Sequence, residues 1–178
     1  MDLFILPWNT LDPTALEENV GRTTHSFVAL TEMTNHHVKS PGEINLLHFS
    51  GLRYYYQKDY VNAEKLLMQT LSLQHQHFVP NNLLTAETLH LLAVVVYHQG
   101  RETDALDYLD KALMILKASK MMHPLLGKVA YMIGYIHFRQ QKHSASFTFF
   151  QESLMVMKNF YNSPHPLMAK IHAHLATI

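Results

Sequence analysis

Histidine is the residue type in this sequence that is best suited to metal or proton chemistry, and there are 14 of them. Two pairs lie two positions apart, His75 with His77 and His172 with His174. On a helix this spacing points the two rings to different faces, whereas a zinc motif such as H-E-x-x-H places them four apart, and that string is absent. The sequence therefore predicts no metal site, and we interpret the histidines as surface or capping residues.

The motifs of nucleotide-binding and hydrolytic enzymes are missing as well. The sequence contains no G-x-x-x-x-G-K-[ST], no G-x-G-x-x-G and no G-x-S-x-G, and its acidic residues form no evident pair. It has no cysteine, which excludes a disulfide framework and a thiolate metal site. We therefore expect a protein that is not an enzyme and that needs no cofactor.

The charge balance and the hydropathy of the chain argue against two classes of partner, nucleic acids and membranes. Lys and Arg number 14 and so do Asp and Glu, so the formal net charge is zero, whereas nucleic-acid binders normally show a basic excess. No stretch approaches the roughly 18 apolar residues that span a bilayer, and the apolar start of the chain is too short for a secretory signal. We expect a cytoplasmic protein that contacts neither nucleic acid nor membrane.

The chain repeats a pattern of small residues with a period of about 42. The pattern holds at two positions, with steps of 42 or 41 residues: Gly51, Ala93 and Gly134 at the first, and Ala63, Ala105 and Ser146 at the second. Two antiparallel helices need small residues where their axes approach most closely, and the larger Leu67, Leu109 and Phe150 would fill the space between units. The repeat predicts an all-α solenoid of antiparallel helix pairs, with about three repeats and a terminal helix.

Signals for helix ends agree with this period. Ser40, Pro41 and Glu43 have the order of a capping box with proline in the first turn. Asp59 is a candidate N-cap for a helix that starts at about residue 60, and Gly100 marks a turn within the second unit. We expect units at about 41–82, 83–123 and 124–165, a half unit at 166–178, and a degenerate helical capping segment at 1–40.

The sequence of small, aromatic, turn, alanine and leucine positions resembles the tetratricopeptide repeat. The long period, the His-Pro pairs that open the third and fourth units and the Leu-Leu-Ala at 91–93 most resemble kinesin light chain repeats. This resemblance covers about 41–178, and it implies a scaffold or adaptor that binds a peptide or helix of a partner protein in a concave groove.

In such proteins the first helix of each pair lines the groove. The resemblance assigns ten residues of this chain to it: His48, Tyr55, Tyr56, His90, Tyr97, His98, Tyr131, Tyr135, Phe138 and Arg139. Aromatic residues and arginine anchor binding interfaces because they offer a large contact area. The alternative interpretation is that several of them only pack between adjacent units.

Two other functions stay open. The resemblance extends to repeat arrays attached to signalling NTPases and methyltransferases, so the chain could be the regulatory fragment of a larger enzyme, or it could be an oligomerisation module. The final helix has five apolar residues and no second helix after it: Leu167, Met168, Ile171, Leu175 and Ile178. One hypothesis is a homodimer through this end, and the alternative is that the lone helix caps the array.

Overall fold

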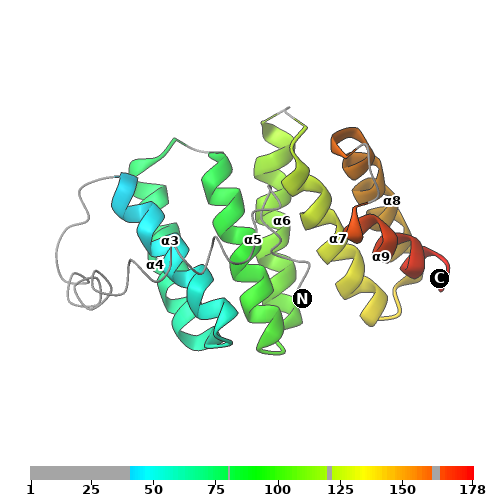
Figure 1. The fold of residues 1–178 in the computed structure, drawn as a ribbon, viewed down its shortest axis with the longest axis horizontal. Helices are drawn as coiled ribbons and strands as arrows, with labels where there is room; N and C mark the ends of the chain where they lie inside the picture. The colour runs from blue at the N-terminus through cyan, green and yellow to red at the C-terminus, as the bar shows by residue number, and fades with distance from the viewer. Residues whose placement is uncertain (1–40, 80, 120–121, 162–164) are drawn as a thin grey trace.

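The chain is an array of helices in the computed structural model, which describes residues 41–79, 81–119, 122–161 and 165–178. Within these ranges there are seven α-helices and no strand: α3 (Pro41–Tyr56), α4 (Tyr60–His77), α5 (Leu83–His98), α6 (Glu102–Ala118), α7 (Pro124–Arg139), α8 (His143–Phe160) and α9 (Pro166–Leu175). They lie side by side in chain order (Figure 1). The expected three pairs and terminal helix are confirmed, whereas the expected capping segment lies outside the described residues.

The two helices of each pair are joined by the same tight turn. Lys58, Gly100 and Gln141 occupy equivalent positions, and each has a positive φ, of 62°, 83° and 58°. In the second unit the amide of Gly100 donates to the carbonyl of Tyr97 at 2.9 Å, and the same bond occurs from Lys58 and Gln141. The turn predicted at Gly100 is therefore confirmed, and the same turn occurs in all three units. Glycine suits this position because it adopts a positive φ at little cost.

The helix starts also follow the sequence signals. The carboxylate of Asp59 accepts from the backbone N–H of Asn62 at 3.1 Å, as an N-cap does. His123 and His165 cap α7 and α9 in the same way, because each Nδ1 accepts from the amide two residues ahead, at 3.3 and 3.1 Å. Two of the histidines interpreted as surface or capping residues are therefore caps, each placed before the proline that opens its helix.

Close helix crossings confirm the repeat register. A Cβ added to Gly51 would lie 2.7 Å from Leu67 and 3.5 Å from the carbonyl oxygen of Ala63, and one added to Gly134 would lie 2.9 Å from the Phe150 ring. Gly51 and Gly134 are therefore at the crossing points of their own pairs. Leu67, Leu109 and Phe150 are fully buried, as expected for the residues that fill the space between helices.

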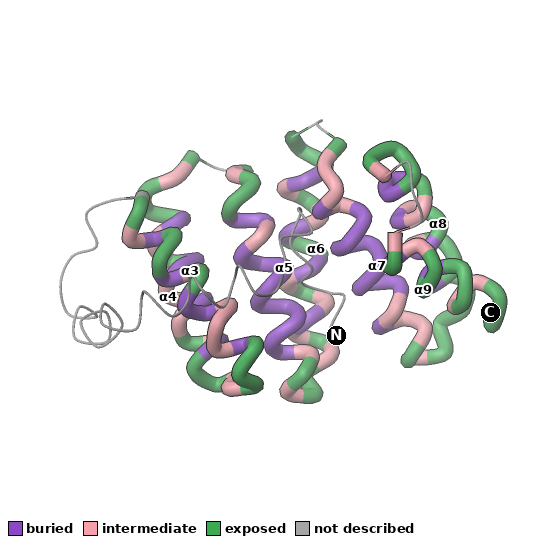
Figure 2. The backbone as a smooth tube through the Cα atoms, viewed as in Figure 1, coloured by how far each residue is buried: buried purple, intermediate pink, exposed green. Residues whose placement is uncertain are grey.

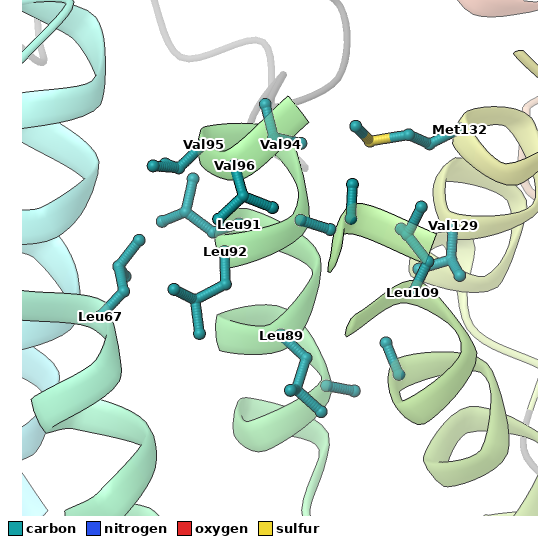
Figure 3. Close-up of a cluster of buried hydrophobic side chains, with 14 of the residues drawn as sticks. Leu67, Leu89, Leu91, Leu92, Val94, Val95, Val96, Leu109, Val129 and Met132 are labelled. Carbon is teal, nitrogen blue, oxygen red and sulfur yellow. The ribbon is translucent and has the colours of Figure 1, made fainter. Parts of the chain in front are cut away.

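The centre of the core is α5, which is buried on almost every side (Figure 2). Every residue from Thr88 to Val96 is buried. Figure 3 shows Leu91 and Leu92 of α5 between Leu67 of α4 on one side and Leu109, Val129 and Met132 of the following helices on the other. The second unit thus packs against a neighbour on each side, as repeat arrays require.

A second cluster closes the C-terminal end of the array. Leu167 and Ile171 of α9 are buried against Tyr131, Phe150 and Met157, and Met168 and Leu175 pack around them. Ile178 is 39% exposed. Four of the five apolar residues of the final helix therefore cover the third unit.

No helix in the described part of the chain combines the length and the apolar character that a membrane span requires.

Candidate functional site

Aromatic rings form a continuous path across the first helices of the array. In order, the members are Tyr56, Tyr55, His98, Tyr97, Tyr135, His174 and Phe138, and we call this set the aromatic ladder. Successive ring centroids lie 5.1 to 6.0 Å apart. These distances are typical of interacting aromatic pairs. The ladder runs from α3 through α5 and α7 to α9, so one strip of side chains connects all four units.

At the junction of the first and second units, His98 joins the ladder to α4. Its Nε2 lies 3.4 Å from the hydroxyl of Tyr55, and its ring is stacked on Tyr60 with an interplanar angle of 7° and a centroid distance of 5.2 Å. His98 itself is exposed. The ring is therefore positioned by two tyrosines while it keeps a solvent-facing surface.

At the junction of the second and third units, Tyr97 and Tyr135 form a hydrogen-bonded pair. Burial and the hydrogen bond to Tyr135 raise the pKa of Tyr97 to about 12, so its hydroxyl stays neutral. Arg139 is exposed, and its guanidinium donates to Tyr135. Nearby, the side-chain amide of Gln140 donates to the carboxylate of Glu102 at 3.2 Å. This junction therefore combines neutral aromatic surface with the exposed cation of Arg139 and the nearby carboxylate of Glu102.

At the junction of the third and fourth units, His174 sits among four aromatic rings. It is stacked on Phe150 at 5.3 Å with an angle of 8°, and the rings of Tyr135 and Phe138 lie 5.5 and 5.1 Å away. The hydroxyl of Tyr131 lies 3.5 Å from its Nε2. Desolvation, and then the charge of Lys170, lower the pKa of His174, which favours the neutral ring.

His174 was not predicted as a site residue, because the sequence showed it only as half of a pair two residues apart. A usable signal did exist in the repeat. Tyr131 and His174 are 43 residues apart, and so are Tyr55 and His98, another tyrosine and histidine that meet between units.

The ten residues predicted for the groove form two groups, one buried and one accessible to solvent. Tyr55, His90 and Tyr131 are buried, so their side chains pack between units. The other predicted residues keep accessible surface: His48, Tyr56, Tyr97, His98, Tyr135, Phe138 and Arg139. The alternative interpretation given for the set, packing between units, thus describes the environment of the three buried residues.

The two predicted histidines at the N-terminal side of this surface lie in low-dielectric surroundings. The Nδ1 of His48 is 3.0 Å from the hydroxyl of Thr88, which also accepts from the side-chain amide of Gln74 at 3.0 Å. Burial lowers the pKa of His48 to about 4. Burial and the nearby charge of Lys128 lower the pKa of His90 to about 3. Both rings are therefore neutral at physiological pH.

Among the described residues, no three His, Asp or Glu side chains come together in a group that could hold a metal ion.

The stacked antiparallel helix pairs define the class of protein as an all-α solenoid. Residues 43–118 match the family model described as tetratricopeptide repeat. No curated protein matches the chain in sequence.

Three solved structures share the fold. BtubC (BKLC) from P. vanneervenii is 12% identical with a TM-score of 0.75, and the match covers 91% of this chain and 66% of that one. The nearly identical TPR-like repeats of a putative kinesin light chain from Podosopora anserina are 17% identical, with a TM-score of 0.67 and coverages of 79% and 67%. The N-terminal domain of stress-induced protein-1 from C. elegans is 18% identical, with a TM-score of 0.56 and coverages of 74% and 93%.

Residues 43–118 thus match the tetratricopeptide repeat, and the described array has the fold of these solved structures. The chain spans about two thirds of the length of the first two of these structures. Tetratricopeptide domains are in general modules for protein–protein interaction and are typically not catalytic, which agrees with the class of function expected from the repeat.

Proposed function

We propose that this protein is a scaffold or adaptor that binds an extended peptide or a helix of a partner protein on the surface of the aromatic ladder. The observation that carries the proposal is the ladder itself, whose accessible members lie next to the exposed guanidinium of Arg139. Tyrosine and arginine are enriched among the residues that contribute most to binding interfaces.

The surface has a defined chemical character. Tyr97 stays neutral because its pKa is raised to about 12, and His48 stays neutral because its pKa is lowered to about 4. A neutral aromatic strip suits apolar and aromatic side chains, while Arg139 offers hydrogen bonds to a carboxylate or a backbone carbonyl. We therefore expect the partner segment to be amphipathic, with apolar side chains against the ladder and an acceptor group near Arg139.

The test compares the wild-type chain with a double variant, Tyr97→Ala with Phe138→Ala. Partners are first recovered by affinity purification and mass spectrometry, and the affinity of a recovered partner is then measured by calorimetry. Loss of two aromatic anchors is expected to weaken binding at least tenfold, about 1.4 kcal/mol or more.

The matched control is Met114→Ala with Met155→Ala, two exposed side chains on the second helices α6 and α8. These changes are expected to leave the affinity unchanged. If the ladder variant binds as tightly as the control variant, and both are folded by circular dichroism, the ladder is not the binding surface.

A further inference from the structure

One face of α3 is exposed at positions of the repeat that are buried in the later first helices. Leu46 and Phe49 of α3 are 46% and 63% exposed. The equivalents of Leu46 in α5, α7 and α9 are fully buried: Thr88, Val129 and Ile171. The equivalents of Phe49 in α5 and α7 are buried as well: Leu91 and Met132. The face of α3 that is open to solvent is therefore the one that the later units use for packing.

In the second unit, a neighbouring helix covers these positions. The side-chain amide of Gln74 of α4 donates to the hydroxyl of Thr88 at 3.0 Å. Leu67 of α4 faces Leu91 of α5 (Figure 3). Among the described residues, no helix precedes α3 to cover it in the same way. The exposed face of α3 is thus a surface on which another helix can pack.

We propose that a second copy of this chain covers this face, so that the two α3 helices pack antiparallel about a two-fold axis. In a two-fold pair both copies use the same surface, so that surface must be complementary to itself. With the axis midway between positions 46 and 49, each Leu46 lies opposite Phe49 of the other copy. Two apolar side chains from each copy are then removed from water together at the centre of the contact.

The charges at the two ends of α3 make the face self-complementary. The acidic Glu43 lies in the first turn of the helix, and the basic Arg53 lies in the last turn. Antiparallel packing places the first turn of each helix opposite the last turn of the other, so opposite charges come near each other at both ends of the contact. Parallel packing would bring like charges together. The charge pattern therefore favours the antiparallel arrangement, and it does so through the sign of the two charges alone.

The same edge of the array continues on α4. Leu66 of α4 is partly exposed, and its repeat equivalent in α6 is Tyr108. The hydroxyl of Tyr108 donates to the sulfur of Met68 in the preceding unit at 3.3 Å, so this position of the repeat also meets a neighbouring unit. Because the contact is centred on one helix of each copy, we expect a reversible dimer. The proposal is independent of the function proposed for the aromatic ladder.

Sedimentation of the full chain over a concentration series tests the dimer. We expect the wild type to change from monomer to dimer as its concentration rises. Phe49→Glu should need at least about tenfold more protein to reach the same fraction of dimer, because a carboxylate would be buried in an apolar contact. Phe49 is exposed in the single chain, so the variant should remain folded by circular dichroism. Met114→Glu, at an exposed position of α6, is the matched control and should dimerise as the wild type does.

Other occupants of the face have distinct outcomes in this experiment. A wild type that stays monomeric at every concentration would overturn the proposal and leave the face to another protein or to the residues before α3. A dimer that forms equally well in Phe49→Glu would overturn it as well. If such a dimer is lost in Ile178→Lys, the contact between the copies lies at α9 instead.

Disulfide trapping tests the antiparallel arrangement. The chain contains no cysteine, so an introduced thiol is the only one in each copy. When the variants Leu46→Cys and Phe49→Cys are mixed and oxidised, we expect the disulfide between positions 46 and 49 of different copies to form faster than either symmetric disulfide. Met114→Cys is the control and should cross-link more slowly than the mixed pair. Symmetric disulfides that form as fast as the mixed one would contradict the antiparallel pair.

Discussion

Ser146 donates a hydrogen bond from its Oγ to the carbonyl oxygen of Gly134, 2.9 Å away across the crossing of α7 and α8. Two helical turns further along the same interface, the Oγ of Ser153 donates the equivalent bond to the carbonyl oxygen of Gly127 at 2.6 Å. The small residues of the third unit therefore do two things: they let the helices approach, and they satisfy buried hydroxyl groups on the partner helix.

Because α7 and α8 cross closely at Gly134, we expect the substitution Gly134→Ala to destabilise the folded protein. Alanine favours helix over glycine, but its Cβ would lie 2.9 Å from the ring of Phe150 and 3.2 Å from the Cβ of Phe149. Phe150 is fully buried and stacked on His174, so it has little room to move. We expect the free energy of unfolding to fall by about 1–3 kcal/mol.

Urea denaturation of the variant checks this prediction. Ser144→Ala, at an exposed position of α8, is the control and should change the free energy of unfolding by less than about 0.5 kcal/mol. A Gly134→Ala variant that is more stable than the wild type would show that the crossing tolerates a methyl group.

The buried histidines predict a loss of stability in mild acid. The pKa values of His48 and His90 are lowered from 6.5 to about 4 and about 3 in the folded state, mainly by burial. Below pH 6.5 the unfolded chain therefore binds more protons than the folded chain, and stability decreases as the pH falls. At pH 5 the fully buried His90 alone contributes a loss of about 2 kcal/mol relative to pH 7.

Thermal unfolding between pH 7.5 and pH 5 measures this effect. His90→Leu removes the titrating group and should flatten the pH dependence, whereas Ser144→Ala, which removes no titrating group, should leave the slope unchanged. The prediction is wrong if the His90→Leu variant loses stability toward pH 5 as steeply as the wild type.

Two positions at the C-terminal end of α9, Leu175 and Ile178, are expected to respond differently to a charge. Leu175 packs against the cluster that contains Phe150 and Ile171, so Leu175→Lys should lower the melting temperature. Ile178 follows the helix and is 39% exposed, so Ile178→Lys should have a much smaller effect. A cost of about 1–2 kcal/mol is expected for Leu175→Lys, because Leu175 is only partly buried and the longer lysine can reach solvent.

Sedimentation of both variants beside the wild type tests the homodimer hypothesis at the same time. A dimer through this end would dissociate in Ile178→Lys, although that variant remains folded. A wild-type chain that sediments as a monomer at every concentration would contradict the homodimer and favour the cap.

The helix pairs could be predicted from sequence because a crossing requires a small residue, and Gly51, Ala93 and Gly134 report it directly. Helix starts were predictable for a similar reason, since Asp59 and the His-Pro pairs act on their own first turn. Both signals are local to a unit. Because these signals recur in each unit with the same period, they can be distinguished from chance matches in the sequence.

The site was less predictable because its environment is set between units. The repeat alignment placed Tyr55 and Tyr56 together, but Tyr55 is buried and contacts His98 of α5, in the next unit, whereas Tyr56 stays accessible. His174 was missed for the same reason: its four aromatic neighbours come from α7 and α8. Sequence spacing within one helix contains no information about such neighbours.

The burial of α5 on almost every side has a consequence for the order in which the chain folds. The second unit offers a prepared surface to a neighbour in both directions, so folding that begins there can grow toward either end. Leu92→Ala in α5 should therefore slow refolding, while Ile171→Ala in α9 should mainly speed unfolding, a difference that stopped-flow kinetics resolves. Equal effects of both changes on the refolding rate would argue against nucleation at the centre. If the difference is found, the middle of the array determines how fast the protein folds, and the packing of α9 determines how slowly it unfolds.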